Sequence, residues 1–232
     1  MSKDVIIACD FASKAEVMDF LGLFNERKPF VKIGMELFYA EGPQIVRDIK
    51  ARGHKIFLDL KLHDIPNTVK KAMSVLSGLD VDMTNVHASG TRAMMEAAIA
   101  GLTRPDGTRP ILIAVTQLTS TSQEQMNADL LIPSPLPEVV THYAMNAKSA
   151  GLDGVVCSPL EAGMVKSACG AGFVTVTPGI RFPDSASDDQ TRITSPAKAR
   201  EIGSDYIVVG RPVTASSDPL AAYERCIKEF LG

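Results

Sequence analysis

Residues 55–61 read KIFLDLK, a short run of apolar residues with one charged residue at its start and two near its end. Successive side chains of a strand point to opposite faces, so the isoleucine and the two leucines share one face, and Phe57, Asp59 and Lys61 share the other. The all-apolar face is typical of a strand that packs against helices, and in a closed barrel the second face points inward. Asp59 and Lys61 would then lie about 6.5–7 Å apart along the strand, near its C-terminal end.

Similar apolar, β-branched runs recur along the whole chain and predict further strands. The expected strands lie at 5–10, 30–36, 55–61, 83–88, 111–118, 154–158, 174–178 and 206–210. Segments with helical periodicity lie at 14–25, 42–52, 66–78, 91–101, 138–150, 159–170, 195–203 and 218–231. Strands that alternate with helices form parallel βαβ units, and eight such units predict one α/β domain over residues 1–232, a single (β/α)8 TIM barrel. The alternative is a doubly wound open sheet, although no glycine-rich GxGxxG turn follows the first strand.

Composition argues against several classes of partner. The net charge is −3, and this mildly acidic balance disfavours a binder of nucleic acid or of membrane surfaces. No apolar stretch approaches the ~18 residues of a membrane span, and the first apolar run is too short for a signal peptide. The four cysteines show no CxxC spacing and are expected to be reduced, mostly buried thiols: Cys9, Cys157, Cys169 and Cys226. Together these features predict a cytoplasmic protein.

Four charged residues are expected in the mouth of the barrel: Asp10, Lys32, Asp59 and Lys61. Asp10 ends the first strand, and Lys32 falls on the inner face of the second. Charges inside a barrel are costly unless they are paired, and barrel active sites lie at the C-terminal ends of the strands. A purely structural ion-pair cluster is the alternative interpretation. Asp64 has a separate alternative, as the cap of the helix that follows it.

An array of alternating ammonium and carboxylate groups favours particular chemistry. Carboxylate neighbours stabilise the charged form of Lys61, so it would donate a proton and would not act as a nucleophile. A fixed carboxylate repels a negative group on a bound substrate, and the repulsion eases if that group leaves as neutral CO₂. The nearby ammonium can stabilise the developing carbanion and then protonate it. Decarboxylation fits this pattern, and proton transfer beside a carbonyl fits it as well.

Two glycine–arginine turns follow the last two expected strands, TPGIR with Gly179 and Arg181, and VVGRP with Gly210 and Arg211. In many barrels the loops after strands seven and eight hold a phosphate. Glycine lets backbone N–H groups approach a phosphate oxygen, and arginine adds a planar charged fork. The alternative is a turn glycine followed by a solvated arginine. The long polar segment 181–194 could fold over a ligand and exclude water.

The run DLKLHDIPNT at 59–68 resembles the DxKxxD signature of the orotidine 5′-phosphate decarboxylases. Other segments resemble the bacterial form of that family: ACDFAS at 8–13, FVKIGMELF at 30–38, AVTQLTS at 114–120, GLDGVVCS at 151–158, TVTPGIR at 175–181 and IVVGRP at 207–212. The resemblance covers essentially the whole chain. It implies decarboxylation of orotidine 5′-monophosphate (OMP) to UMP in de novo pyrimidine biosynthesis, with no metal and no organic cofactor.

The same resemblance implies a role for each matching residue. Lys61 would protonate C6 of the pyrimidine, and Asp59 would crowd the carboxylate of the substrate. Lys32 and Asp64 would complete the charge array. The implied binding residues are Asp10 and Lys32 at the ribose, Thr119 at the pyrimidine, and Arg181, Gln190, Gly210 and Arg211 at the phosphate, with Gln190 also able to reach the base. Members of the family are homodimers, in which Asp64 and Thr68 would reach into the partner's site.

Two rival functions remain at this point. A metal-dependent sugar-phosphate decarboxylase or aldolase shares the DxKxxD core, but the resemblance implies an acidic metal ligand on its second strand. This chain has Lys32 there, and an ammonium repels Mg²⁺. The other rival is a catalytically silent protein that binds a phosphate-bearing ligand, although an inactive descendant should have lost a charge of the array and none is missing.

Overall fold

The computed structural model describes residues 3–183 and 193–232, which form a closed barrel of parallel strands. The strands are β1 (Asp4–Ala8), β2 (Phe30–Ile33), β3 (Ile56–Leu62), β4 (Met83–His87), β5 (Ile111–Val115), β6 (Gly154–Val156), β7 (Val174–Thr177) and β8 (Tyr206–Val209). They follow one another around the barrel in sequence order, and β1 pairs with β8 to close it. The predicted TIM barrel is confirmed, and the open doubly wound sheet is wrong.

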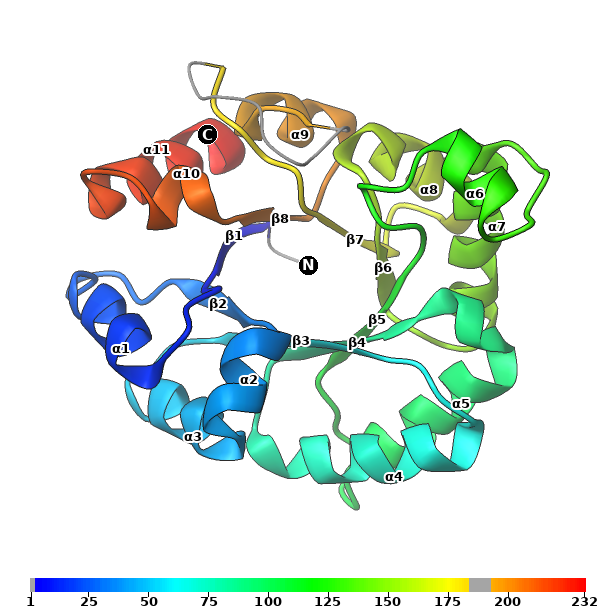
Figure 1. The fold of residues 1–232 in the computed structure, drawn as a ribbon, viewed down its shortest axis with the longest axis horizontal. Coiled ribbons are helices and arrows are strands. Elements are labelled where there is room, and N and C mark those ends of the chain that lie inside the picture. The colour runs from blue at the N-terminus through cyan, green and yellow to red at the C-terminus, as the bar shows by residue number, and fades with distance from the viewer. Residues whose placement is uncertain (1–2, 184–192) are drawn as a thin grey trace.

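Helices surround the barrel on its outside (Figure 1). They are α1 (Lys14–Gly22), α2 (Met35–Glu41), α3 (Pro43–Ala51), α4 (Pro66–Leu76), α5 (Thr91–Leu102), α6 (Gln123–Ala128), α7 (Leu136–Ser149), α8 (Ala162–Cys169), α9 (Pro196–Ile202), α10 (Arg211–Thr214) and α11 (Pro219–Leu231). Each segment with helical periodicity overlaps one of these helices, although α7 begins two residues before its predicted segment and α5 ends one residue after its own. The sequence pattern does not predict the short helices α2, α6 and α10, which lie in the connections that follow β2, β5 and β8.

The residues that precede α1 and α4 differ in how they begin the helix. The Ser13 side chain accepts a hydrogen bond from the backbone N–H of Glu16 and caps α1. Asp64 does not cap α4, so that interpretation is wrong. Ile65 precedes the helix instead, and the Asp64 carboxylate accepts from the Ile65 N–H at 2.6 Å.

Alternation along the strands separates two apolar regions, as KIFLDLK predicts. The side chains of Ile56, Leu58 and Leu60 belong to the large cluster between the sheet and the helices. Phe57 belongs to a second cluster inside the barrel, made of Ile6, Ala8, Phe30, Phe57, Met83, Ile113, Val174, Val176, Tyr206 and Val208. This apolar plug fills the barrel and forms a floor, so polar side chains further along the strands lie above it.

Three aspartates repeat one arrangement at the N-terminal end of the barrel. Each precedes an even-numbered strand, accepts a hydrogen bond from an N–H near the start of the preceding strand, and pairs with a cation: Asp82 with Ile56 and Lys50, Asp153 with Leu112 and Arg109, and Asp205 with Thr175 and Lys166. These pairs hold the strands in register at the end of the barrel opposite the charged array.

The remaining compositional expectations concern cysteines and membrane spans. Cys9, Cys157, Cys169 and Cys226 are all free and buried, as predicted. Among the described helices, none has the length and apolar character needed to cross a membrane.

Candidate active site

Two adjoining cavities open at the C-terminal ends of the strands, above the apolar floor. The first has a volume of about 240 Å³ and the second of about 280 Å³. They share Lys32, Pro178 and Val208 as lining residues, so they form two parts of one site. Their location agrees with the general rule that barrel enzymes place their chemistry at this end of the strands.

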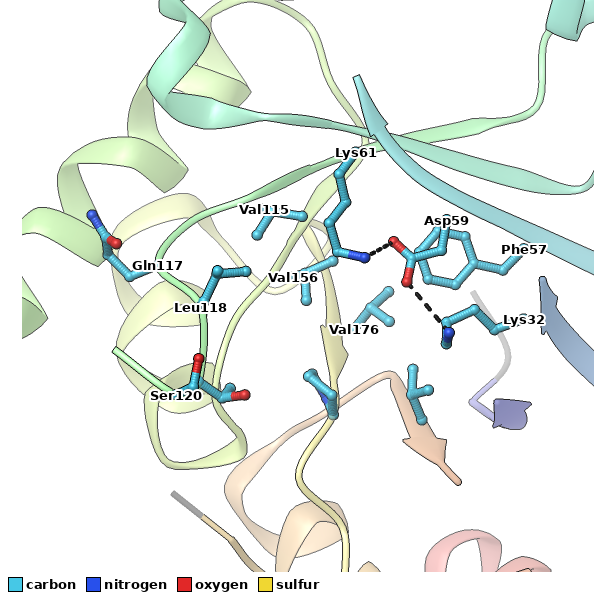
Figure 2. A pocket seen from close by; sticks show the side chains of 13 residues that line it. Lys32, Phe57, Asp59, Lys61, Val115, Gln117, Leu118, Ser120, Val156 and Val176 are labelled. Carbon is cyan, nitrogen blue, oxygen red and sulfur yellow. Dashed lines mark ion pairs between the residues drawn. The ribbon is translucent and has the colours of Figure 1, made fainter. Parts of the chain in front are cut away.

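The four predicted charges lie together as one alternating chain. Lys32 Nζ is 2.8 Å from Asp10 Oδ1 and 3.6 Å from Asp59 Oδ2. Lys61 Nζ is 2.8 Å from Asp59 Oδ1. Figure 2 shows the side chains of Lys32 and Lys61 converging on the Asp59 carboxylate from opposite sides. The side chains of Lys32, Asp59 and Lys61 line the first cavity, whereas Asp10 and Lys32 line the second.

Lys32 and Asp59, at the centre of this row of charges, are largely buried and stabilise each other's charged form. Burial opposes ionisation of Asp59, but the ammonium groups of Lys32 and Lys61 outweigh it and hold the pKa of Asp59 below its usual value. Burial likewise opposes the charged form of Lys32, and Asp59 and Asp10 outweigh it and raise the pKa of Lys32. Lys32 and Asp59 are therefore both ionised at neutral pH.

Gly34, directly after β2, leaves room for the ion pair between Asp10 and Lys32. A Cβ atom at Gly34 would lie 3.1 Å from Asp10 Oδ1 and 3.2 Å from Lys32 Nζ. Either distance is tighter than ordinary van der Waals contact. Glycine at this position therefore clears the space in which Asp10 and Lys32 meet.

Strand β3 departs from regular geometry where it presents Lys61. The pairing of β3 with β4 shifts register between Leu58 and Leu62. Lys61 has a φ of 52°, in the left-handed region that residues other than glycine adopt rarely. The simple alternation predicted for Asp59 and Lys61 is thus interrupted at Lys61, although both side chains still meet in the cavity.

The two glycine–arginine turns come together in the second cavity, as predicted. Its lining residues include Gly179, Arg181, Gly210 and Arg211. Gly179 has a φ of 82°, which favours glycine. Arg181 N donates to Thr194 O at 3.0 Å and Thr194 N donates to Gly179 O at 3.1 Å, so the two ends of segment 181–194 are joined at its base.

Gln190 lies outside the described residues, as does the rest of 184–192. Its contact with phosphate and base therefore stays a prediction, and so does the closing of segment 181–194 over a ligand.

Residues that follow β5 line the wall of the first cavity opposite the charged residues of β2 and β3. Thr119, predicted to contact the pyrimidine, is among them and is buried. Gln117 and Ser120 also line this wall (Figure 2), and the sequence interpretation did not single them out. Thr214 of α10 lines the second cavity and was missed in the same way. Their only signal is a position within three residues of a predicted site residue, Thr119 or Arg211.

Asp64 and Thr68 lie away from both cavities of this chain. Both are exposed, near the start of α4, and neither lines the first or the second cavity. The structure of one chain thus brings Asp10, Lys32, Asp59 and Lys61 together and leaves Asp64 outside the group. Asn85, which the sequence interpretation missed, contacts the group directly through a hydrogen bond to Asp59.

No three His, Cys, Asp or Glu side chains within 3–183 and 193–232 are grouped so that they could hold a metal ion.

Comparison with known proteins agrees with this geometry. Residues 3–226 match the family model described as Orotidine 5'-phosphate decarboxylase / HUMPS family. Proteins named orotidine 5′-phosphate decarboxylase from Geobacillus thermodenitrificans and Bacillus caldolyticus are 54% and 57% identical to this chain; the alignments cover 100% of it and 98% and 96% of those relatives. A crystal structure of orotidine 5′-phosphate decarboxylase from Lactobacillus acidophilus is 41% identical, with a TM-score of 0.89 and full coverage of both chains. The chain therefore belongs to the orotidine 5′-phosphate decarboxylase / HUMPS family and is an enzyme of the carboxy-lyase class.

Proposed function

We propose that this chain converts OMP to UMP and CO₂ in de novo pyrimidine biosynthesis, using its own side chains without a metal or an organic cofactor. The observation that carries the proposal is the chain of alternating charges from Asp10 to Lys61, which opens directly onto the cavity of the two glycine–arginine turns. One part of the site suits a reacting carboxylate, and the other suits the phosphate of a nucleotide.

Asp59 and Lys61 would have different roles in the reaction. The ionised Asp59 lies where it repels the carboxylate of the bound substrate, and that repulsion is relieved as the C6–carboxylate bond breaks and neutral CO₂ leaves. The electron pair of the broken bond stays on C6. The Lys61 ammonium stabilises this developing charge and then gives its proton to C6, and it regains a proton from solvent. Lys32 keeps Asp59 ionised between two cations.

The second cavity would hold the rest of the nucleotide. Arg181 and Arg211 offer charged forks to the phosphate, and Gly210 offers main-chain contact between them in the same cavity. Gln190 would add a contact from segment 181–194. The remaining implied contacts are Asp10 and Lys32 with ribose hydroxyls and Thr119 with the pyrimidine. Binding energy from the phosphate, which does not react, can hold the pyrimidine against the repelling carboxylate.

The proposed active form is a homodimer in which Asp64 and Thr68 enter the partner's site. Both residues are exposed, and Ile65 between them exposes 67% of a large apolar side chain. All three side chains are therefore accessible to a second subunit. The four free thiols suit the reducing cytoplasm, which we propose as the compartment.

The position of Lys32 separates this function from the metal-dependent sugar-phosphate enzymes. Its ammonium is paired with Asp10 and Asp59, so the protein itself already supplies a cation to both carboxylates. A divalent cation placed there would meet a fixed positive charge.

Turnover of OMP, followed by ultraviolet absorbance before and after treatment with a chelator, tests the proposal. We expect rapid conversion to UMP, unchanged by the chelator. A protein that binds UMP but leaves OMP intact would be a silent binder, and loss of activity on chelation would favour the metal-dependent rival.

A further inference from the structure

Asn85 lies on the inner face of β4, among the charges of the site. It is completely buried. Met83, two residues earlier, belongs to the apolar cluster inside the barrel, so strand alternation places Asn85 on the same inward face. An amide at this depth needs hydrogen-bond partners, and the partners it has are the two residues proposed to perform the reaction.

The Asn85 amide contacts Asp59 and Lys61 at once. Asn85 Nδ2 donates to Asp59 Oδ1 at 2.6 Å. Asn85 Oδ1 accepts from the backbone N–H of Lys61 at 2.8 Å. Asp59 Oδ1 is also the atom that pairs with Lys61 Nζ at 2.8 Å. The Asn85 side chain therefore fixes both the Asp59 oxygen that pairs with the Lys61 ammonium and the main chain that carries the Lys61 side chain.

The irregular backbone of β3 explains why such a contact is needed. The ladder between β3 and β4 shifts register between Leu58 and Leu62, and Lys61 has a left-handed φ of 52°. Where a ladder is interrupted, a buried N–H needs another acceptor. The Asn85 carbonyl supplies it for Lys61, and so holds a backbone conformation that lysine would otherwise rarely adopt.

We infer that Asn85 is a positioning residue of the proposed reaction, which keeps the Asp59 carboxylate and the Lys61 ammonium in one fixed geometry within the cavity. It acts through these two residues. The amide does not line either cavity itself, so it has no direct part in holding the ligand.

Thr84 provides a matched control on the same strand. It is also completely buried, and its Oγ1 donates to Leu58 O of β3 at 3.0 Å. It lies on the outward face, away from the charges. Thr84→Val removes one buried hydrogen bond between the same two strands, and its contact leads to no group of the site.

The test compares Asn85→Leu, Asn85→Asp and Thr84→Val for kcat, KM, affinity for UMP and melting temperature. Asn85→Leu removes both hydrogen bonds, and we expect kcat to fall about 100-fold because a small misplacement of reacting groups has an effect of that order. UMP affinity should change far less. Asn85→Asp keeps almost the same shape and retains the acceptor for Lys61, but it sets a carboxyl against Asp59, so kcat should fall here too. Thr84→Val should lower the melting temperature and keep kcat.

A kcat of Asn85→Asp equal to that of the unsubstituted enzyme would overturn the inference, as would equal effects of Asn85→Leu and Thr84→Val on kcat. Asn85→Asp decides the matter if Asn85→Leu fails to fold. Because the positioning role rests on the proposed function, Lys61→Ala and Asp59→Asn are measured alongside. Normal turnover in those two variants would refute the proposed roles of Lys61 and Asp59. Loss of turnover in them, with normal kcat in Asn85→Asp, would refute the role of Asn85 alone.

Discussion

Asparagine in place of Asp59 removes the anion that two lysines share and nearly keeps the shape of the side chain. The carboxylate oxygens lie 2.8 Å from Lys61 Nζ and 3.6 Å from Lys32 Nζ. At an effective dielectric constant of about 20, the gross attractions are about 6 and about 5 kcal/mol. Desolvation offsets much of this, and removing one partner of a buried pair costs about 3–5 kcal/mol. With about 2–4 °C per kcal/mol for a chain of this size, the melting temperature should fall by about 6–20 °C.

The pH dependence of this loss follows from the pKa of Asp59. Burial opposes ionisation, but Lys32 and Lys61 outweigh it, so the pKa in the folded state lies below that in the unfolded chain. The stabilisation is present above the unfolded pKa of about 3.9 and is lost as pH falls through the folded pKa. Calorimetry at neutral pH and in acid should therefore find a difference between Asp59→Asn and the unsubstituted enzyme that shrinks in acid. Asp129→Asn, an exposed change of the same kind, serves as control.

The same substitution tests the proposed repulsion between Asp59 and the substrate. Two negative charges about 4 Å apart repel by about 4 kcal/mol at that dielectric constant, so Asp59→Asn could favour binding of OMP over UMP by up to about 1000-fold. We expect kcat to fall while this binding ratio rises. An Asp59→Asn enzyme that keeps both its melting temperature and its OMP-to-UMP binding ratio would refute the reasoning.

Three further predictions concern the phosphate cavity, the β2 turn and one buried histidine. Arg211→Ala should weaken phosphate-bearing ligands far more than the bare nucleoside, and equal losses in binding assays would show that Arg211 does not hold phosphate. Gly34→Ala should lower kcat by pushing apart the first ion pair of the array, whereas Gly22→Ala, whose Cβ meets nothing within 4 Å, should not. His54 is buried, and its Nδ1–H donates to a backbone carbonyl, whereas its Nε2 has no hydrogen-bond partner among the described residues; burial lowers its pKa. The folded state therefore binds fewer protons than the unfolded chain near the unfolded pKa of about 6.5, so denaturation midpoints should fall as pH drops from about 8 to about 5, less steeply in His54→Gln. A midpoint that rises over this range would contradict the assignment.

Strand positions and their inward faces could be predicted because both follow from local alternation. The apolar runs alone locate every strand, and the face of Asp59 and Lys32 follows from their spacing to neighbouring apolar residues. The same rule could have found Asn85, because it shares the inner face of β4 with Met83. Asn85 was missed because the interpretation relied on inward-facing charged residues, and an amide is neutral.

Other features depend on contacts that no local pattern encodes. The period-2 pattern of FVKIGME continues through Met35, so it predicts a longer strand, whereas the structure ends β2 at Ile33 and begins α2 directly after Gly34. The left-handed backbone of Lys61 is likewise invisible in the sequence, because it results from the register shift against β4.

The most direct measurement of the central claim is the rate of OMP turnover by Lys61→Ala, with UMP affinity measured on the same preparation. If an ammonium paired with a buried carboxylate delivers the proton to the pyrimidine, turnover should fall by many orders of magnitude while UMP still binds. Turnover close to that of the unsubstituted enzyme would contradict the account.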